Sequence, residues 1–266
     1  MDQLTTERDP RPESEPPGEP EAESGKMSFL EHLDELRRRI IHILIFIVLG
    51  FCACFYFSDR IYDFLAVPLT KSLPPGMRPV FTRLTDPFSL YMKVSILAGI
   101  FLTAPLTLYE VWKFISPGLY RKEKRFVLPF LFSSVMLFLT GGAFAYYIVL
   151  PRAYEFLLKL GGSFQPMIEI KDYLDLTDTI ILGFGLIFEM PVIVAFLAMF
   201  GLVSARFLWT KFKYAILVIF ILAGVLSPTP DAITQCIYAG PMVMLYLISI
   251  LVAALFGWRR RRKGLV

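Results

Sequence analysis

Long apolar blocks separated by short charged segments dominate the pattern along this chain. A helix needs about 20 mostly apolar residues to cross the roughly 30 Å hydrocarbon core of a bilayer. Lipid offers the backbone no hydrogen-bond partners, so a spanning segment is helical unless it belongs to a closed barrel. The pattern therefore predicts an all-α polytopic membrane protein with six transmembrane helices, at about residues 40–57, 88–112, 126–150, 176–200, 207–226 and 233–258.

The fifth predicted span is the shortest. Its uninterrupted apolar part runs only from Tyr214 to Leu226. Including residues 207–212 lengthens it, because Lys211 and Lys213 are long enough to extend their ammonium groups to the water boundary. A re-entrant hairpin with the following helix is the alternative.

Segments outside these spans have distinct compositions. Residues 1–26 are acidic and rich in proline, a composition typical of disordered tails, whereas residues 259–266 form a basic tail. The intervening membrane domain covers 27–258. It opens with MSFLEHLDELRRRI, where apolar residues at helical spacing predict a short interfacial helix that leads into the first span.

Charge predicts the orientation of the spans. One side of the frame collects most of the Lys and Arg, around residues 37–39, 121–125, 206–213 and 259–263. Short cytoplasmic loops carry such an excess, so both termini are expected in the cytoplasm.

Candidate catalytic and metal-binding residues are sparse. Cys52, Cys54 and Cys236 lie in predicted spans and are expected to be small buried hydrophobes. His32 and His42 are the only histidines, and they lack the spacing of a zinc-binding helix. The sequence contains no phosphate-binding GxxxxGK[ST] loop. We therefore expect that the protein is not an enzyme, that it binds no metal or other cofactor, and that it has no nucleic-acid partner.

Glu189 lies within an otherwise apolar run. A charge at mid-bilayer costs about 2.5 to 3.5 kcal/mol on insertion scales, so such residues usually face protein or water and are functional. Pro191 removes the N–H that would bond to the Ile187 carbonyl, which predicts a kink beside the acid. Gly183 and Gly185 permit close approach of another helix. The alternative is a protonated Glu189 that bonds to a neighbouring hydroxyl and only holds helices together.

The outer loops also carry structural signals. Asp231 is predicted to cap the last helix. Five prolines between residues 58 and 87, Pro68 among them, predict a preshaped external cap. Residues 151–159 and the acidic segment IEIKDYLDLTD at 168–178 are predicted to form short outer helices.

Four segments occur in an order that resembles TatC, the multispanning subunit of the twin-arginine protein translocase. They are LEHLDELRRRI at 30–40, YEVWKFISPGLYRKEKR at 109–125, FGLIFEMPV at 184–192 and SPTPDAITQ at 227–235. The resemblance covers 27 to about 258. It implies a concave, glove-like bundle in the bacterial cytoplasmic (inner) membrane that receives twin-arginine signal peptides. It also implies export of folded proteins with the proton-motive force, in a hetero-oligomer with single-span TatA- or TatB-type subunits.

The resemblance also implies roles for individual residues. Glu35 and Glu123 match the signal-recognition acids, and Arg37, Phe114 and Leu119 match positions near the same surface. A planar guanidinium donates two parallel hydrogen bonds to one carboxylate, which a lysine does not.

The alternative for Glu35 and Glu123 is that basic residues next to them in the sequence already neutralise their charges. Arg38 and Arg39 follow Glu35 at helical spacing, and lysines flank Glu123 on both sides.

Contact with partner subunits is implied for two membrane positions. The family's equivalent of Glu189 lies on a concave, membrane-exposed face and contacts a polar residue of a single-span partner. Gln235 matches a second position of partner contact. Pro68, Pro191 and Asp231 are expected to be structural. Many members carry a further acid in the last span, where this chain has Leu247.

Two other functions compete with this interpretation. A secondary transporter of a small solute or ion would use Glu189, but such transporters commonly contain paired broken helices in internal repeats. FGLIFEMPV has no second copy in this sequence. A passive scaffold without a client is the third possibility.

Overall fold

The computed structural model describes residues 29–74, 76–115, 127–162, 164, 167–227, 229 and 231–262. Within these ranges the structure is helical and contains no β-strand, so the predicted all-α architecture is confirmed. The elements are α1 (Phe29–Phe55), α2 (Ser58–Ser72), α3 (Asp86–Ile115), α4 (Val127–Phe144), the π-helical turn η3 (Ala145–Val149), α5 (Leu150–Leu160), α6 (Ile170–Ile187), α7 (Met190–Met199), α8 (Ala205–Thr210), α9 (Phe212–Leu226) and α10 (Ala232–Arg262).

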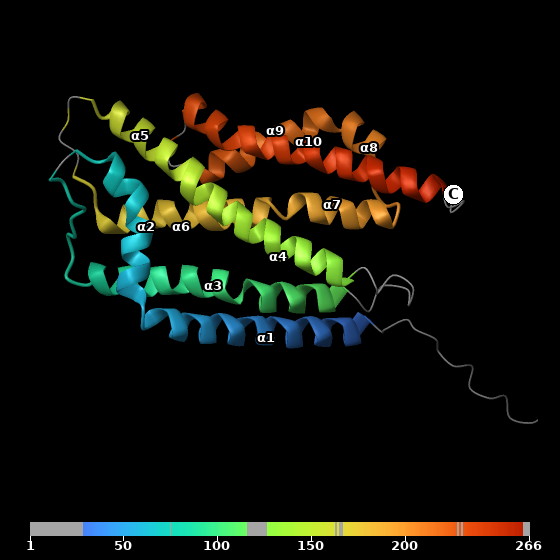
Figure 1. Ribbon diagram of the computed structural model, residues 1–266, viewed down its shortest axis with the longest axis horizontal. Coiled ribbons are helices and arrows are strands. Elements are labelled where there is room, and N and C mark those ends of the chain that lie inside the picture. The colour runs from blue at the N-terminus through green and yellow to red at the C-terminus, as the bar shows by residue number, and fades with distance from the viewer. Residues whose placement is uncertain are drawn as a thin grey trace, which may run out of the picture.

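Five helical stretches in the described chain are long and apolar enough to cross a membrane. They are Glu31–Phe55, Asp86–Ile115, Val127–Leu160, Ile170–Met199 and Ala232–Trp258. The apolar helix α9 is shorter, at 15 residues. The start of α1 and the end of α10 lie at the same end of the bundle (Figure 1).

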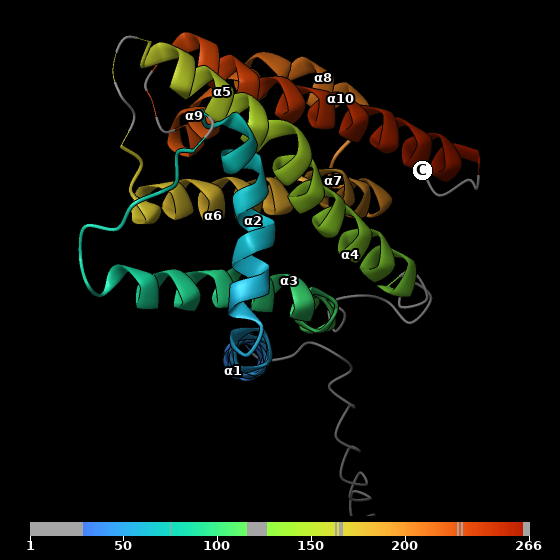
Figure 2. The ribbon, with the colours of Figure 1, turned by 60° about the vertical axis from the view of Figure 1, so that its left-hand side comes forward.

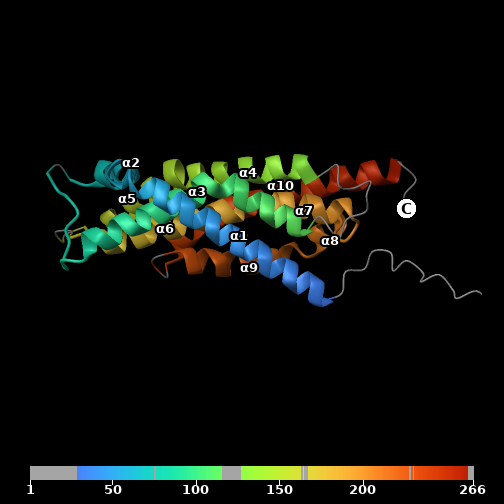
Figure 3. The same ribbon diagram turned by 90° about the horizontal axis from the view of Figure 1, so that it is seen from below.

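The helices pack around α6, which lies between the α1–α3 pair and the α9–α10 pair (Figure 1). Ile180 and Phe184 on α6 are completely buried. α4 crosses the bundle diagonally and continues through η3 into α5 (Figure 2). The view from below shows the same elongated bundle, with α1 and α3 side by side (Figure 3).

The contact between α1 and α3 is made through glycine. A Cβ atom on Gly50 would lie 2.7 Å from the Gly99 carbonyl oxygen, and a Cβ on Gly99 would lie 2.7 Å from the Phe51 nitrogen. Any side chain at these positions would force the two helices apart. Small residues that let backbones touch are a common way to pack helices in a membrane, where apolar burial between helices gains little.

Two charged side chains at the start of α1, Glu35 and Arg39, turn inward although most of their neighbours are exposed. Leu33 and Ile40 are 43% and 47% exposed, whereas the side chains of Glu35 and Arg39 are each only 13% exposed. Lipid solvates apolar side chains, while charged ones need partners in the protein. The helix is also continuous from Phe29 to Phe55, so the predicted short interfacial helix is the first part of α1 and not a separate element.

The proline-rich outer loop contains the helix α2, with Pro68 buried inside it. A proline within a helix leaves the carbonyl four residues earlier without its N–H partner, which here is the carbonyl of Phe64. The Tyr146 hydroxyl donates a hydrogen bond of 2.6 Å to that oxygen. The next carbonyl, that of Leu65, accepts from the Tyr173 hydroxyl at 2.7 Å. These two bonds attach α2 to η3 and α6.

Both predicted short helices of the third loop are parts of longer ones. The segment 151–159 lies within α5, which continues from α4 through η3. Most of IEIKDYLDLTD forms the first turns of α6. Val80 donates to the Ile168 carbonyl and accepts from the Ile170 N–H, both at 2.9 Å, so this start is bonded to the loop after α2.

The fifth predicted span, 207–226, is divided between α8 and α9 at Lys211. The ammonium groups of Lys211 and Lys213 both lie within 5.4 Å of the Tyr214 ring centre. Cysteine burial was also predicted incorrectly, because only Cys54 is buried while Cys52 and Cys236 are exposed. A lipid-facing position is as apolar in sequence as a core position, which explains the error.

The turn between α9 and α10 contains the predicted helix cap. The Asp231 carboxylate accepts hydrogen bonds from the N–H groups of Ile233 and Thr234, at 3.0 and 2.9 Å. It also accepts from the hydroxyls of Thr229 and Thr234. Hydrogen bonds from both threonine side chains and from the backbone lower the pKa of Asp231 from 3.8 to about 2.

We predict that Tyr146→Phe destabilises the protein because the Phe64 carbonyl loses its donor. An unpaired acceptor away from water costs about 1 to 3 kcal/mol. In a Pro68→Ala background the restored N–H supplies the missing donor, so Tyr146→Phe should then cost little. Thermal unfolding of the four proteins in detergent measures this coupling, and equal losses in both backgrounds would contradict the assignment.

Asp231 should make stability depend on pH through its charge. Its pKa in the folded protein lies below the unfolded value, so its contribution is complete above about pH 4 and is lost as the pH falls towards about 2. In Asp231→Asn the amide oxygen still accepts the two backbone N–H bonds that cap the helix, while the charge and the second acceptor oxygen are lost. We expect the difference in melting temperature between the wild type and Asp231→Asn to shrink across that window. A difference that does not change with pH would show that the charge contributes nothing.

Candidate functional site

A buried ion-pair network joins α1 to α3 near the end of the bundle where the described chain begins. Arg39 donates from Nη2 to Glu35 Oε1 at 2.9 Å and from Nη1 to Glu110 Oε2 at 2.8 Å. The side chains of Glu35 and Arg39 are 13% exposed, and that of Glu110 is 7% exposed. We refer to Glu35, Arg39 and Glu110 as the triad.

The helix geometry explains how the triad forms. Glu35 and Arg39 are four residues apart and therefore share one face of α1. That face lies against α3, which supplies Glu110. Within the described chain two buried triad atoms, Glu35 Oε2 and Arg39 Nε, have no hydrogen-bond partner. The local ion pair that the alternative predicted for Glu35 is therefore present, but it leaves one carboxylate oxygen open.

Other sequence-predicted residues lie close to the triad along the same two helices. The Phe114 ring at the end of α3 stacks on His32 of α1, with ring centres 4.5 Å apart. Arg37 is exposed. Leu119 and Glu123 lie outside the described residues. The last residue of α3 and the first of α4, Ile115 and Val127, lie at the same end of the bundle as the start of α1 (Figure 1).

Sequence reasoning missed Glu110. The residue stands within the quoted segment YEVWKFISPGLYRKEKR, and the available signal was an acid inside an otherwise apolar helix. Its importance depends on a contact with a residue 71 positions away, which no local pattern contains.

Glu189 lies at a break in the bundle, between α6 and α7. The regular helical bonding is interrupted, because the Glu189 N–H bonds to Leu186, three residues earlier. Pro191 follows within the first turn of α7, and the predicted kink is therefore a full interruption of the helix. Gly183 and Gly185 on α6 lie against α9 and α4, as their close approach to Leu226 and Phe138 shows.

The Glu189 side chain is directed into the protein. It is 9% exposed, which contradicts the membrane-exposed position that the resemblance implied. It interacts with the hydroxyl of Ser134 on α4, and Ser134 accepts a hydrogen bond of 3.0 Å from the Trp112 indole of α3. Glu189 Oε1 is buried and has no partner in the described chain. This arrangement agrees with the helix-holding alternative and leaves one acceptor available.

Gln235 lies in the contact between α9 and α10. Its amide nitrogen donates to the Phe220 carbonyl at 2.7 Å and lies 3.1 Å from the position of a Cβ atom on Gly224. Leu247, also on α10, is 39% exposed. No described contact joins Gln235 to Glu189.

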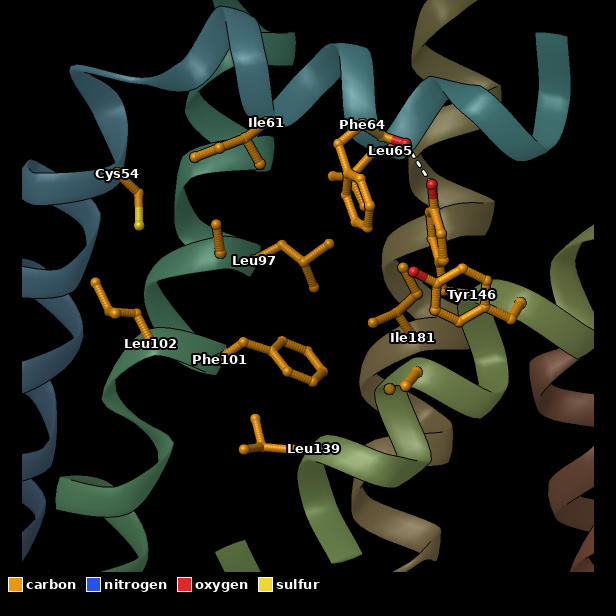
Figure 4. Close-up of a pocket in the computed structure, with 14 residues that line it drawn as sticks. Cys54, Ile61, Phe64, Leu65, Leu97, Phe101, Leu102, Leu139, Tyr146 and Ile181 are labelled. Carbon is orange, nitrogen blue, oxygen red and sulfur yellow. Dashed lines mark hydrogen bonds between the residues drawn. The ribbon is translucent and has the colours of Figure 1, made fainter. Parts of the chain in front are cut away.

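The bundle also has an apolar cavity of about 570 Å³ beneath α2, which is open to the outside of the protein. Figure 4 shows Phe64 of α2, Phe101 of α3 and Ile181 of α6 around it. The Tyr146 hydroxyl at its edge is already bonded to the Phe64 carbonyl. Among the residues that the structure describes, neither Glu189 nor any other carboxylate lines the cavity. Its chemistry suits apolar groups and is unsuited to ions and small polar solutes.

Comparisons with known proteins give a consistent assignment. The family model for Sec-independent protein translocase protein (TatC) matches residues 31–241. A relative of that name from Koribacter versatilis is 49% identical over 240 residues, which cover 89% of each chain. Another from Desulforapulum autotrophicum is 42% identical over 239 residues, or 90% of this chain and 88% of the relative.

A solved structure agrees with the sequence comparisons. The crystal structure of a twin-arginine translocase receptor, TatC, matches with a TM-score of 0.76 and 36% identity. The match covers 85% of this chain and 99% of that chain. With a family match over most of the chain, close relatives and the same fold, this multi-pass membrane protein belongs to the TatC family of Sec-independent protein translocases.

Proposed function

We propose that this chain is the core and signal-receptor subunit of a twin-arginine protein translocase. It binds twin-arginine signal peptides of folded cargo, which the complex exports with the proton-motive force. The observation that supports a receptor role most directly is the unpaired oxygen of Glu35, a buried acceptor on a carboxylate that an ion pair holds in place.

The chemistry of the triad suits a guanidinium ligand. Arg39 uses one nitrogen for Glu35 and the other for Glu110, so neither carboxylate is bound at both oxygens by Arg39. Glu35 Oε2 is an unpaired acceptor that is buried, so an incoming guanidinium would bond to it after displacing the side chains that cover it. A hydrogen bond to a charged group contributes about 1.5 to 3 kcal/mol, and a planar fork donates it in a fixed direction.

We assign the second signal arginine to Glu123. Ile115 and Val127, which flank the segment containing Glu123, lie at the same end of the bundle as Glu35 (Figure 1). Phe114, Leu119 and Arg37 are proposed as further contacts with the signal. In this assignment the exposed charge of Arg37 repels cationic ligands that do not reach the acids.

Partner subunits are proposed to bind at two positions within the membrane. A single-span TatA- or TatB-type subunit with a polar residue would reach Glu189 Oε1, which is buried and lacks a partner in the described chain, by displacing the side chains that cover it. Gln235 is proposed as a second contact, through the amide oxygen that remains after its nitrogen bonds to Phe220. The assembly is then a hetero-oligomer in the membrane.

We place the protein in the bacterial cytoplasmic (inner) membrane with both termini in the cytoplasm. The support is the excess of Lys and Arg on the side of the membrane where α1 starts and α10 ends. The secondary-transporter alternative gains no support, because the apolar cavity is not lined by Glu189.

We predict that a twin-arginine signal peptide crosslinks to positions 35 and 123 and that binding weakens in both Glu35→Gln and Glu123→Gln. Each substitution removes a charged acceptor, worth about tenfold in affinity or more. Asp34→Asn is the matched control, since it removes an exposed acid on the same helix. Equal capture of twin-arginine and twin-lysine peptides by the wild type would contradict recognition through the two acids.

Glu189→Gln should leave peptide affinity unchanged and reduce co-purification of the single-span partner subunit. Glutamine fills the same space but lacks the carboxylate that the partner would contact. Glu155→Gln, on the exposed face of α5, serves as the control. If Glu189→Gln and Glu155→Gln retain the partner equally, Glu189 acts only within its own chain through Ser134.

A further inference from the structure

We infer that Glu110 is a positioning residue for signal recognition. Its negative charge offsets the positive charge of Arg39, so that Glu35 can still attract a cationic ligand. This inference rests on the proposed receptor function. It adds to Glu35 a residue on another helix, which acts through Arg39 and does not touch the signal peptide.

The triad is arranged so that Arg39 is shared. Its two terminal nitrogens reach different carboxylates, Glu35 at 2.9 Å and Glu110 at 2.8 Å. If Arg39 bonded to both oxygens of Glu35, neither oxygen would be without a donor and fewer acceptor sites would remain for a ligand. Instead, Glu110 on α3 accepts the hydrogen bond from Nη1 of Arg39. Glu35 Oε2 is left without a partner in the described chain.

Charge balance gives the same result. Two carboxylates and one guanidinium leave the triad with one net negative charge, whereas Glu35 and Arg39 alone would be neutral. The three side chains are largely buried, so water screens their interaction only weakly. A neutral pair attracts a cationic peptide poorly, and a net negative triad attracts it.

Two further basic groups face Glu110. His42 Nδ1 lies 3.6 Å from the same Glu110 oxygen that Arg39 contacts. Lys113 interacts electrostatically with Glu110, but it is exposed and its ammonium lies 5.6 Å from the Tyr109 ring centre. Exposure to water reduces the effect of Lys113. Arg39 therefore makes the strongest contact with Glu110.

The competing explanation is that Arg39 and Glu110 only connect α1 to α3. The two explanations differ for a double variant. Removing both Arg39 and Glu110 deletes the connection but leaves Glu35 with its full negative charge. A connecting role predicts that binding stays weak in the double variant, and charge balance predicts that binding returns.

The test compares purified full-length wild type with Glu110→Gln, Arg39→Gln, the double variant and Glu35→Gln in lipid nanodiscs. A fluorescent twin-arginine signal peptide is titrated at low and high salt, and melting temperatures are measured in parallel. We expect Glu110→Gln to weaken binding at least tenfold and the double variant to recover to within about threefold of the wild type. The loss should shrink at high salt because screening weakens charge attraction.

Several outcomes would overturn the inference. Unchanged binding in a folded Glu110→Gln would do so, as would a folded double variant that binds no better than Glu110→Gln. If Glu110→Gln does not fold, Arg39→Gln decides, since its two net negative charges must tighten binding and an equal or weaker affinity rejects the idea.

Glu35→Gln separates this inference from the proposed function. If Glu35→Gln binds as well as the wild type, the receptor assignment through Glu35 fails. If Glu35→Gln is weak while Glu110→Gln is unaffected, only the role of Glu110 fails. Asp34→Asn controls for the loss of an acid from α1 outside the triad.

Discussion

A polar group removed from water needs a partner within the protein, and several specific contacts in this structure follow from that constraint. Pro68 leaves a carbonyl free, and the Tyr146 hydroxyl from a distant helix bonds to it. Glu189 lies at a helix break and turns inward to Ser134 instead of outward to lipid. Arg39 divides its donors between two acids on different helices. These contacts fix the arrangement of helices whose apolar surfaces gain little from mutual burial.

The same constraint explains why polar side chains in this fold serve both structure and function. A charged group that is fully satisfied within the chain has nothing left to offer a ligand. Glu35 and Glu189 each have one buried oxygen with a partner missing in the described chain, and each lies at an end or a break of a helix. The rest of each acid is held by a neighbouring side chain, so the open oxygen has a defined direction.

The two sites use different elements of the frame. The triad depends on α1 and α3, whose backbones touch at Gly50 and Gly99. Glu189 depends on the break between α6 and α7 and on the Ser134 and Trp112 side chains of α4 and α3. α3 contributes to both sites. The other helices of the two sites differ. In the proposed function, signal recognition at the water boundary and partner contact deeper in the membrane therefore use different surfaces of one chain.

The sequence alone determined the helical class, the presence of several membrane-length apolar segments, a kink beside Glu189 and the cap at Asp231, because apolar block length, proline chemistry and capping are local properties. The facing of each helix was decided only by the tertiary structure. Lipid and protein interior are equally apolar, so the pattern gave the wrong burial for Cys52 and Cys236. Glu110 was invisible for the same reason: its role comes from a residue on another helix, and only packing brings the two together.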